Sequence, residues 1–280
     1  MQVFERAGLL TSFIENQKKQ NHSVGFVPTM GALHRGHLSL VKHALRENDL
    51  VVVSIFVNPT QFNNAADLQK YPRVPEVDLK LLREAQTDVV FLPPVKEIYP
   101  NGTQSEEIDL NGLDRHMEGQ FRPGHFQGVV TVVKRFFNIV KPTRAYFGEK
   151  DYQQLQIIRH MTQLHKLNVE IVSHPVERGP GGLALSSRNE LMSLQQKEEA
   201  GFIHKALQWA QKNYRDFNPR QLQEALKARF EKSNLKLEYA LVSDPESLEP
   251  LEEWSQKKGA RLFIAAYMGE VRLIDNVPLF

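Results

Sequence analysis

The sequence contains no cysteine, and this absence removes several kinds of chemistry from consideration. Without thiols, the chain has no disulfide, no zinc–thiolate site and no cysteine nucleophile. The sequence also lacks an apolar run near the ~20 residues that span a bilayer. Its first residues lack the basic flank, apolar core and cleavage site of a secretory signal. We therefore expect a cytoplasmic protein with no membrane partner.

An excess of charge of one sign is also missing. The net charge is +2 at pH 7 and there is no long basic block, so we expect no nucleic-acid partner. The chain has 280 residues, of which 41% are hydrophobic and 24% charged, as is typical of a globular protein with one large or two modest domains. Affinity for a polyanion must therefore come from a local site.

Short apolar runs alternate with helical segments up to Pro175, and this alternation predicts an α/β fold with a Rossmann-like parallel sheet. The expected strands are Val24–Val27, Leu50–Val57, Asp88–Leu92, Ala145–Phe147 and Val169–Val172. The expected helices are Leu38–Arg46, Val77–Gln86, Gly128–Val140 and Asp151–Leu167. In the third helix, apolar residues recur at spacings of three and four, so we expect that face to lie in the core.

After Pro175 the order changes to two helices followed by strands, which indicates an α+β domain. We expect helices near Gln196–Tyr214 and Pro219–Lys232, strands near Leu237–Val242 and Arg261–Ala266, and a last strand, Val271–Ile274, in a hairpin across Gly269–Glu270. The sequence therefore predicts two domains, a Rossmann-like domain over residues 1–175 and a smaller α+β domain over residues 176–280.

The string VGFVPTMGALHRGHLSLVKHAL predicts a strand, a loop with glycines and a helix that begins near His37. In open α/β sheets, ligands bind beyond the carboxyl ends of the strands, where helix N-termini present unpaired N–H groups to anions. Gly31 and Gly36 allow the backbone to approach a ligand closely. Two imidazoles three positions apart, those of His34 and His37, face the same way if one turn includes both.

Three interpretations of this histidine pair compete. Isolated histidines usually have no special role. A metal pair is the second interpretation, but no glutamate lies between the two as in H-E-x-x-H, and the chain has no cysteine to complete a site. Contact with phosphate is the third, and the strand–glycine–helix setting favours it. The sequence therefore predicts phosphate binding and no resident metal site.

Other polar residues stand at the ends of expected strands or at helix starts. Gln61 follows Asn58-Pro59, and its amide suits a substrate with hydroxyl and carboxylate groups, although an ordinary turn after a strand is the better explanation of Gln61 taken by itself. Arg122 and His125 are either functional or simple turn residues at a helix entry. Both interpretations of the pair stay open.

Two further turns combine a structural and a chemical interpretation. Lys150 is a compact cation able to meet phosphate oxygens, while Asp151 also suits a helix cap. Ser187 and Glu190 match an S-x-x-E capping box that would start a helix. Between them, Arg188 offers planar donors suited to pyrophosphate.

The motif H-x-G-H resembles the signature of the nucleotidylyl-transferring α/β superfamily, and the longer string PTMGALHRGHLSLV is similar to the pantoate–β-alanine ligase family. The strings NPTQF, YPR, RPGHF, GEKDYQQ and GLALSSRN resemble the same family. The resemblance extends from about Gly25 to Asp275, with its specific motifs before Met192. It implies ATP-dependent condensation of pantoate with β-alanine to pantothenate through a pantoyl adenylate, with release of AMP and pyrophosphate. It also implies Mg²⁺, a homodimer, and a C-terminal domain that acts as a lid on an ATP- and pantoate-binding N-terminal domain.

The same resemblance implies roles for individual residues. Catalysis would rest on His34, His37, Lys150 and Arg188. Gln61 and Gln154 would contact pantoate, with Gln61 near the β-alanine site. ATP contacts are implied for Met30, Gly31, Ala32, Leu33, His34, Arg35, Gly36, His37, Gly148, Glu149, Lys150, Asp151, Glu177, Leu185, Ser186, Ser187 and Arg188.

The sequence departs from the family pattern at three places. Ala66-Asp67 stands where an acidic pair is usual, Gly181 where an aspartate is usual, and Glu177 where a small or apolar residue is common. The main alternative is another adenylyltransferase of the superfamily with a different small acceptor. A tRNA-binding synthetase fragment needs a basic surface and an extra helical domain, and a metal hydrolase needs ligands that the sequence does not offer.

Overall fold

A computed structural model describes residues 1–62, 68–69, 71–254 and 259–280. The chain forms two compact units. We call them the N-terminal unit, which comprises Met1–Asn111, Arg122–Glu149 and Gln154–Pro175, and the C-terminal unit, which comprises Gly112–Phe121, Lys150–Gln153 and Val176–Phe280. The chain therefore passes from one unit to the other several times, and the GEKD string is divided between them.

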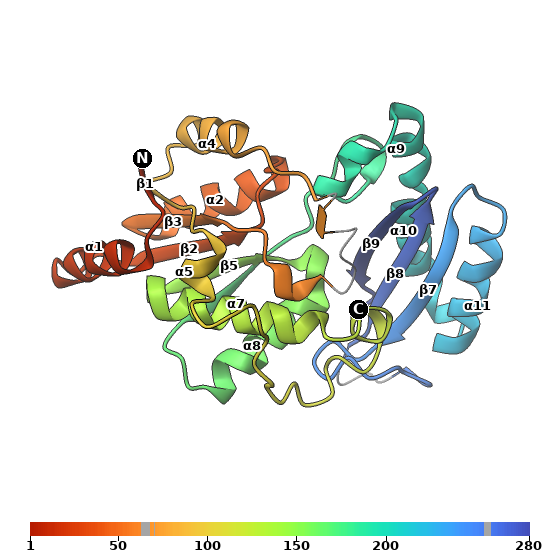
Figure 1. Ribbon diagram of the computed structural model, residues 1–280. Coiled ribbons are helices and arrows are strands. Elements are labelled where there is room, and N and C mark those ends of the chain that lie inside the picture. Colours follow the sequence, from red (N-terminus) through yellow and green to blue (C-terminus); the bar gives the residue numbers. More distant parts are fainter. Residues whose placement is uncertain (63–67, 70, 255–258) are drawn as a thin grey trace. The chain divides into compact units, whose positions relative to one another are not determined.

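The N-terminal unit contains a six-stranded parallel sheet in the order β1-β4-β3-β2-β5-β6 (Figure 1). Its strands are β1 Gln2–Phe4, β2 Val24–Thr29, β3 Leu50–Ile55, β4 Val89–Phe91, β5 Arg144–Gly148 and β6 Glu170–His174. The strand order reverses between the neighbours β2 and β5, so the loops that follow these strands flank a topological switch point. The predicted parallel sheet is confirmed, whereas β1 has only three residues and was not predicted.

Helices cover both faces of this sheet (Figure 1). They are α1 Ala7–Lys19, α2 Arg35–Glu47, α4 Pro75–Glu84, α5 Val95–Ile98, α7 His125–Val140 and α8 Tyr152–Leu164. Helices α2 and α4 pack on one face, against a buried cluster of strand residues. On the other face, Phe136 of α7 lies edge-on to Phe26 of β2. All six apolar residues predicted to face the core from α7 are buried: Val129, Val132, Val133, Phe136, Phe137 and Val140.

The C-terminal unit contains an antiparallel sheet in the order β7-β8-β9, and the predicted hairpin between its last two strands is confirmed. Its strands are β7 Lys236–Ser243, β8 Arg261–Met268 and β9 Val271–Pro278. Its helices are α6 Met117–Phe121, α9 Leu194–Ala200, α10 Phe202–Asn213 and α11 Pro219–Phe230. Buried residues of α10, α11 and the strands form one core cluster.

The single helix expected near Gln196–Tyr214 is wrong, because two helices, α9 and α10, meet at Gly201. A side chain at Gly201 would meet the Gly181 carbonyl oxygen at 2.6 Å, so glycine allows the loop to pack directly on this junction. Among the residues that the structure describes, no helix has the length and apolar character needed to cross a bilayer.

Candidate functional site

The histidine pair forms the start of α2. His34 is the N-cap, one residue before the helix begins at Arg35, and its Nδ1 accepts a hydrogen bond from the Gly36 N–H at 3.1 Å. The His37 Nδ1 in turn accepts from the His34 N–H at 3.3 Å. The two rings lie 4.1 Å apart between centroids, tilted by 36°. The two imidazoles therefore cap the helix reciprocally, as Ser and Glu do in a capping box.

This cap corrects one expectation and indicates the tautomer of both neutral rings. The opening helix was expected to offer unpaired N–H groups to an anion, but the Gly36 N–H in its first turn donates to an imidazole. A ring nitrogen that accepts a hydrogen bond carries no proton. Since Nδ1 accepts in both His34 and His37, each neutral ring carries its proton on Nε2. Nε2–H is a donor suited to a phosphate oxygen.

The loop before the histidines is held by a buried carboxylate. Asp78, in α4, accepts from the Ala32 N–H at 2.9 Å through Oδ2 and from the Leu33 N–H at 2.7 Å through Oδ1. Burial raises the pKa of the Asp78 carboxyl, although these two hydrogen bonds lower it in part. Gly31 has a φ of 80°, and a Cβ there would lie 2.9 Å from the Asp78 carboxylate, so glycine is required at this turn. Asp78 was not singled out from the sequence.

Gln61 lies at the end of a 3₁₀ turn, Pro59–Gln61, with its amide held in one orientation. Its Oε1 accepts from Asn58 Nδ2 at 3.1 Å, and its Nε2 contacts the Met30 sulfur at 2.8 Å. Asn58 is oriented by Tyr99, whose hydroxyl donates to Asn58 Oδ1 at 2.6 Å. Burial raises the pKa of the Tyr99 hydroxyl, which keeps it protonated as a donor. The donor end of Gln61 is therefore presented on the side of Met30.

The first turn of α7 supports the same loop. His125 is buried, and its Nδ1 donates to the Gln61 carbonyl oxygen at 2.8 Å, while its Nε2 accepts from Arg122 at 3.1 Å. A side chain at Gly128 would lie 2.3 Å from the Thr60 carbonyl oxygen, so helix and loop are in direct backbone contact. The helix begins at His125, three residues before the expected start. Arg122 and His125 thus belong to the surroundings of Gln61.

The GEKD string follows β5. Gly148 ends the strand, and Glu149, Lys150 and Asp151 form a 3₁₀ turn before α8. Lys150 Nζ lies 3.5 Å from Asp151 Oδ1, and the Lys150 carbonyl oxygen accepts from Asn276 of β9 at 3.0 Å. Gln154 lies in α8 and is half-buried. Gly148, Glu149 and Gln154 belong to the N-terminal unit, and Lys150 and Asp151 to the C-terminal unit.

The serine turn in the C-terminal unit is capped one residue earlier than expected. Ser186 Oγ accepts from the Arg188 N–H at 3.3 Å, and Asn189 Oδ1 accepts from the Ser186 N–H at 2.7 Å. The predicted box of Ser187 and Glu190 is therefore wrong: Ser187 is buried inside a short 3₁₀ helix, Ser187–Leu191.

The loop that leads to this turn is fixed at its base. The Leu185 N–H donates to the Glu177 carbonyl oxygen at 2.9 Å. Arg178 donates to both carboxylate oxygens of the buried Asp275, at 2.5 and 3.0 Å, and to the Gly182 carbonyl oxygen at 3.0 Å. Gly181 has a φ of 75° and open space around its Cβ position. The ion pair of Arg178 and Asp275 was not predicted, because the two residues are 97 positions apart in the sequence. Ala66, where the sequence departs from the family pattern, lies outside the described residues.

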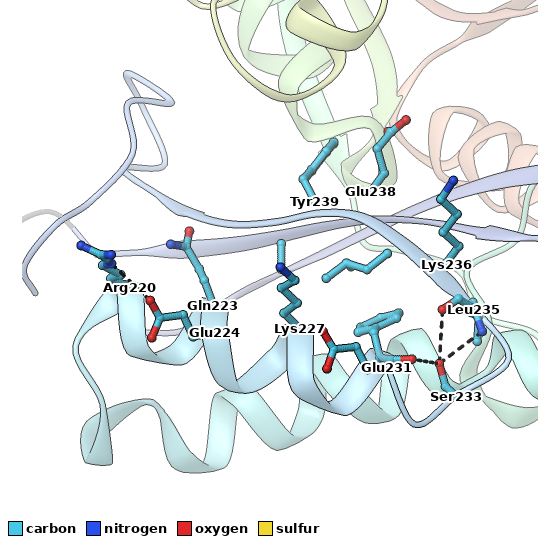
Figure 2. A pocket seen from close by; sticks show the side chains of 13 residues that line it. Arg220, Gln223, Glu224, Lys227, Glu231, Ser233, Leu235, Lys236, Glu238 and Tyr239 are labelled. Atoms are coloured by element: carbon cyan, nitrogen blue, oxygen red, sulfur yellow. Dashed lines mark hydrogen bonds and ion pairs between the residues drawn. The ribbon is translucent and has the colours of Figure 1, made fainter.

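A cavity of about 720 Å³ lies elsewhere in the C-terminal unit, between α11 and β7 (Figure 2). The side chains that line it carry both signs of charge, among them Lys227, Lys236, Glu231 and Glu238. None of the residues expected from the sequence to form a site lines this cavity.

On β9, Arg272 forms ion pairs with Glu118 and Glu238. This network ties the Gly112–Phe121 segment to the sheet, so we interpret it as structural.

The arrangement in the N-terminal unit defines a class of protein. A parallel sheet with its switch point between β2 and β5, and a histidine-capped helix directly after β2, form a Rossmann-like nucleotide-binding fold of the H-x-G-H type. Lys150, Asp151 and the serine turn with Arg188 belong to the C-terminal unit.

Comparison with known proteins specifies the family. The family model described as pantoate-beta-alanine ligase matches residues 2–278. The pantothenate synthetase of Christiangramia forsetii is 47% identical over 100% of this chain and 99% of that protein. A crystal structure of the Thermus thermophilus enzyme has 42% identity and a TM-score of 0.90, covering 100% of both chains. The Francisella tularensis ligase, solved with beta-gamma ATP and beta-alanine, has 38% identity and a TM-score of 0.82, covering 100% of this chain and 98% of that one. The chain belongs to the pantoate–β-alanine ligase family, whose members form an amide bond.

Proposed function

We propose that the chain condenses pantoate with β-alanine to pantothenate in an ATP-dependent reaction, through a pantoyl adenylate, with release of AMP and pyrophosphate. The observation that carries this proposal is the reciprocal cap of α2, which holds two imidazole rings side by side, 4.1 Å apart between centroids, directly after β2 of a Rossmann-like sheet. The Francisella tularensis ligase forms a complex with beta-gamma ATP and beta-alanine, which supports ATP and β-alanine as substrates of this chain.

The first step activates the acid. A carboxylate is a poor acyl donor at neutral pH, so one of its oxygens must become part of a leaving group. The pantoate carboxylate oxygen attacks the α-phosphorus of ATP, the bond from that phosphorus to the bridging oxygen breaks, and pyrophosphate leaves. In the second step the β-alanine amine attacks the acyl carbon, the bond to AMP breaks, and the amine loses a proton as the amide forms.

Four side chains would stabilise the negative charge of the first step. The transition state spreads charge over phosphate oxygens, so fixed donors and cations matter more than a protein nucleophile. His34 and His37 would supply Nε2–H donors, because their Nδ1 atoms accept the hydrogen bonds of the helix cap. Lys150 and Arg188 supply permanent positive charge from the C-terminal unit.

Pantoate would be held by two glutamine amides. Gln61 offers its Nε2–H, since Asn58 already donates to its Oε1, and an N–H donor suits a carboxylate or hydroxyl oxygen. Gln154, on α8, would contact the same substrate. The C-terminal unit would act as the lid that keeps water from the reactive adenylate.

Three further assignments complete the proposal. Mg²⁺ would accompany ATP and neutralise charge on its phosphate oxygens. Among the described residues, no group of three or more acidic or histidine side chains could hold a metal ion. We also propose a homodimer and a cytoplasmic location.

The alternative is an adenylyltransferase of the same superfamily with another small acceptor. The discriminating experiment is ATP–pyrophosphate exchange with pantoate present and β-alanine absent. We expect exchange that depends on pantoate, followed by pantothenate and AMP once β-alanine is added. Exchange without pantoate, or none with it, would reject the proposed function.

A further inference from the structure

Asp78 is a buried acid whose two oxygens both serve the loop between β2 and α2. Its side chain is 1% exposed. Oδ2 accepts from the Ala32 N–H at 2.9 Å, and Oδ1 accepts from the Leu33 N–H at 2.7 Å. Asp78 comes from the first turn of α4, 45 and 46 residues further along the chain, so these bonds join two elements that are distant in sequence.

The loop adopts a backbone conformation that depends on such an acceptor. Gly31 has a φ of 80° and Ala32 a φ of 49°, both in the left-handed region that a residue with a side chain rarely adopts. Turns of this kind direct successive N–H groups to one side and form a small anion-binding concavity. Here the anion is a carboxylate of the chain itself. The Gly31 N–H adds a bond to Thr29 Oγ1 at 3.2 Å.

We propose that Asp78 is a positioning residue for the histidine pair, an inference that rests on the proposed role of these imidazoles in ATP binding. The N–H groups of residues 31 to 34 donate in turn to Thr29, to Asp78 twice, and to His37. The loop is thus formed before nucleotide arrives, and His34 is set as the N-cap of α2. Because the Ala32 and Leu33 N–H groups donate to Asp78, the phosphate contacts that we propose for this loop are those of the histidine side chains.

Asp78→Asn tests the inference with almost no change in shape. One carboxylate oxygen becomes an NH₂ group that faces a backbone N–H, so one bond is replaced by a contact between two donors. If the native loop is then populated at only ~1–10%, the apparent affinity for ATP falls by the same fraction. We expect the KM for ATP to rise about 10- to 100-fold, while kcat at saturating ATP stays within about twofold of the wild-type value, because bound nucleotide restores the loop.

Glu76→Gln is the matched control. Glu76 lies in the same first turn of α4 but is exposed, so the KM of the Glu76→Gln variant for ATP should equal that of the wild type. Asp78→Ala is a second variant, which removes both acceptors without adding a donor, and it should raise the KM for ATP less than Asp78→Asn. An unchanged KM for ATP in Asp78→Asn, with only a lower melting temperature, would overturn the inference. A fall in kcat with unchanged KM would also overturn it.

Two measurements separate this inference from the proposed function. Calorimetric titration with a non-hydrolysable ATP analogue needs no pantoate, so weaker binding by Asp78→Asn than by Glu76→Gln supports the role of Asp78 even if pantothenate is not the product. Hydrogen exchange is measured on the wild-type chain without nucleotide, so it does not depend on whether a variant folds. The Ala32 and Leu33 amides should be protected, and rapid exchange of both would contradict a preformed loop.

Discussion

Two turns of the molecule use the same device with different side chains. At the start of α2, His34 and His37 cap each other's backbone N–H groups, and at the start of the 3₁₀ helix in the C-terminal unit, Ser186 and Asn189 do the same. An imidazole has two ring nitrogens, so one can accept the capping hydrogen bond while the other carries the proton of the neutral ring. In the serine turn, Arg188 lies in the chain between the two capping residues, Ser186 and Asn189. A cap and a ligand contact are therefore compatible at both turns.

The supports of the two turns have opposite charge. The histidine turn rests on a carboxylate, Asp78, which accepts from backbone N–H groups. The loop before the serine turn rests on a guanidinium, Arg178, which donates to the Gly182 carbonyl oxygen and is neutralised by Asp275. Each support satisfies the backbone groups that its loop leaves without a helical or strand partner. The comparison shows that the conformation of each turn depends on a residue that is distant in sequence as well as on the local cap.

The largest effect should come from His37. We expect His37→Ala to slow pantoate-dependent pyrophosphate release by ~10²–10³, because it removes one donor to the transition state. His37→Gln keeps an oxygen that can cap the His34 N–H, as glutamine does at this position of a capping box, but has no imidazole. Both variants should lose the same activity, while only His37→Ala loses stability. A near-normal rate in His37→Gln would assign His37 to capping alone.

The second-largest effect should be a loss of stability when the Arg178–Asp275 ion pair, which supports the loop before the serine turn, is broken. Arg178→Met leaves Asp275 buried without its partner, and we expect the free energy of unfolding in urea to fall by about 3 kcal/mol. Lys197→Met, which breaks an exposed pair with Glu190, should cost less than about 1 kcal/mol. Equal losses in the two variants would show that the Arg178 pair is an ordinary surface contact.

A smaller effect separates the two glycines of the same loop. Gly181 and Gly182 both have positive φ, but a Cβ at Gly181 meets open space, whereas a Cβ at Gly182 would lie 2.2 Å from His204. We expect Gly181→Ala to lower the free energy of unfolding by about 1 kcal/mol through backbone strain alone, and Gly182→Ala to lower it more. The reverse order, measured by urea unfolding, would contradict this account of the loop.

The smallest expected effect is a pH dependence at His204. Burial and then the positive charge of Arg178 lower the pKa of His204 below its ordinary 6.5, while Asp275 opposes them. Because the folded state disfavours the protonated ring, its contribution to stability is present above pH 6.5 and is lost as the pH falls below that value. Wild type should therefore lose more unfolding free energy between pH 7.5 and about pH 5 than His204→Gln does. Parallel pH profiles would reject the shift.

Local patterns predicted the parts of the fold that local contacts determine. The buried run of β3 and the apolar face of α7 have clear periodicity, and both were found. The amphipathic helix α1 and the three-residue β1 were not predicted, since only Leu10 and Ile14 of α1 are buried and β1 is too short for a pattern.

The candidate site also contains residues that the sequence pointed to and residues that it did not. The resemblance to a family named the histidines and Arg188, but no local pattern pointed to their supports. Asp78, Tyr99 and Arg178 act across 41 to 97 residues of sequence, and each looks like an ordinary surface or core residue among its neighbours. The cap at Ser186 was misplaced by one residue because Ser187 and Glu190 match the S-x-x-E pattern, whereas the pair that forms the cap, Ser186 and Asn189, does not.

The central claim is that the histidine pair, Lys150 and Arg188 act on one triphosphate. A crystal structure with a non-hydrolysable ATP analogue tests it most directly. We expect Nε2 of His34 and His37, Nζ of Lys150 and the Arg188 guanidinium to lie within about 3 Å of phosphate oxygens. A bound triphosphate that contacts neither imidazole Nε2, or that leaves Lys150 and Arg188 pointing away from it, would contradict the account.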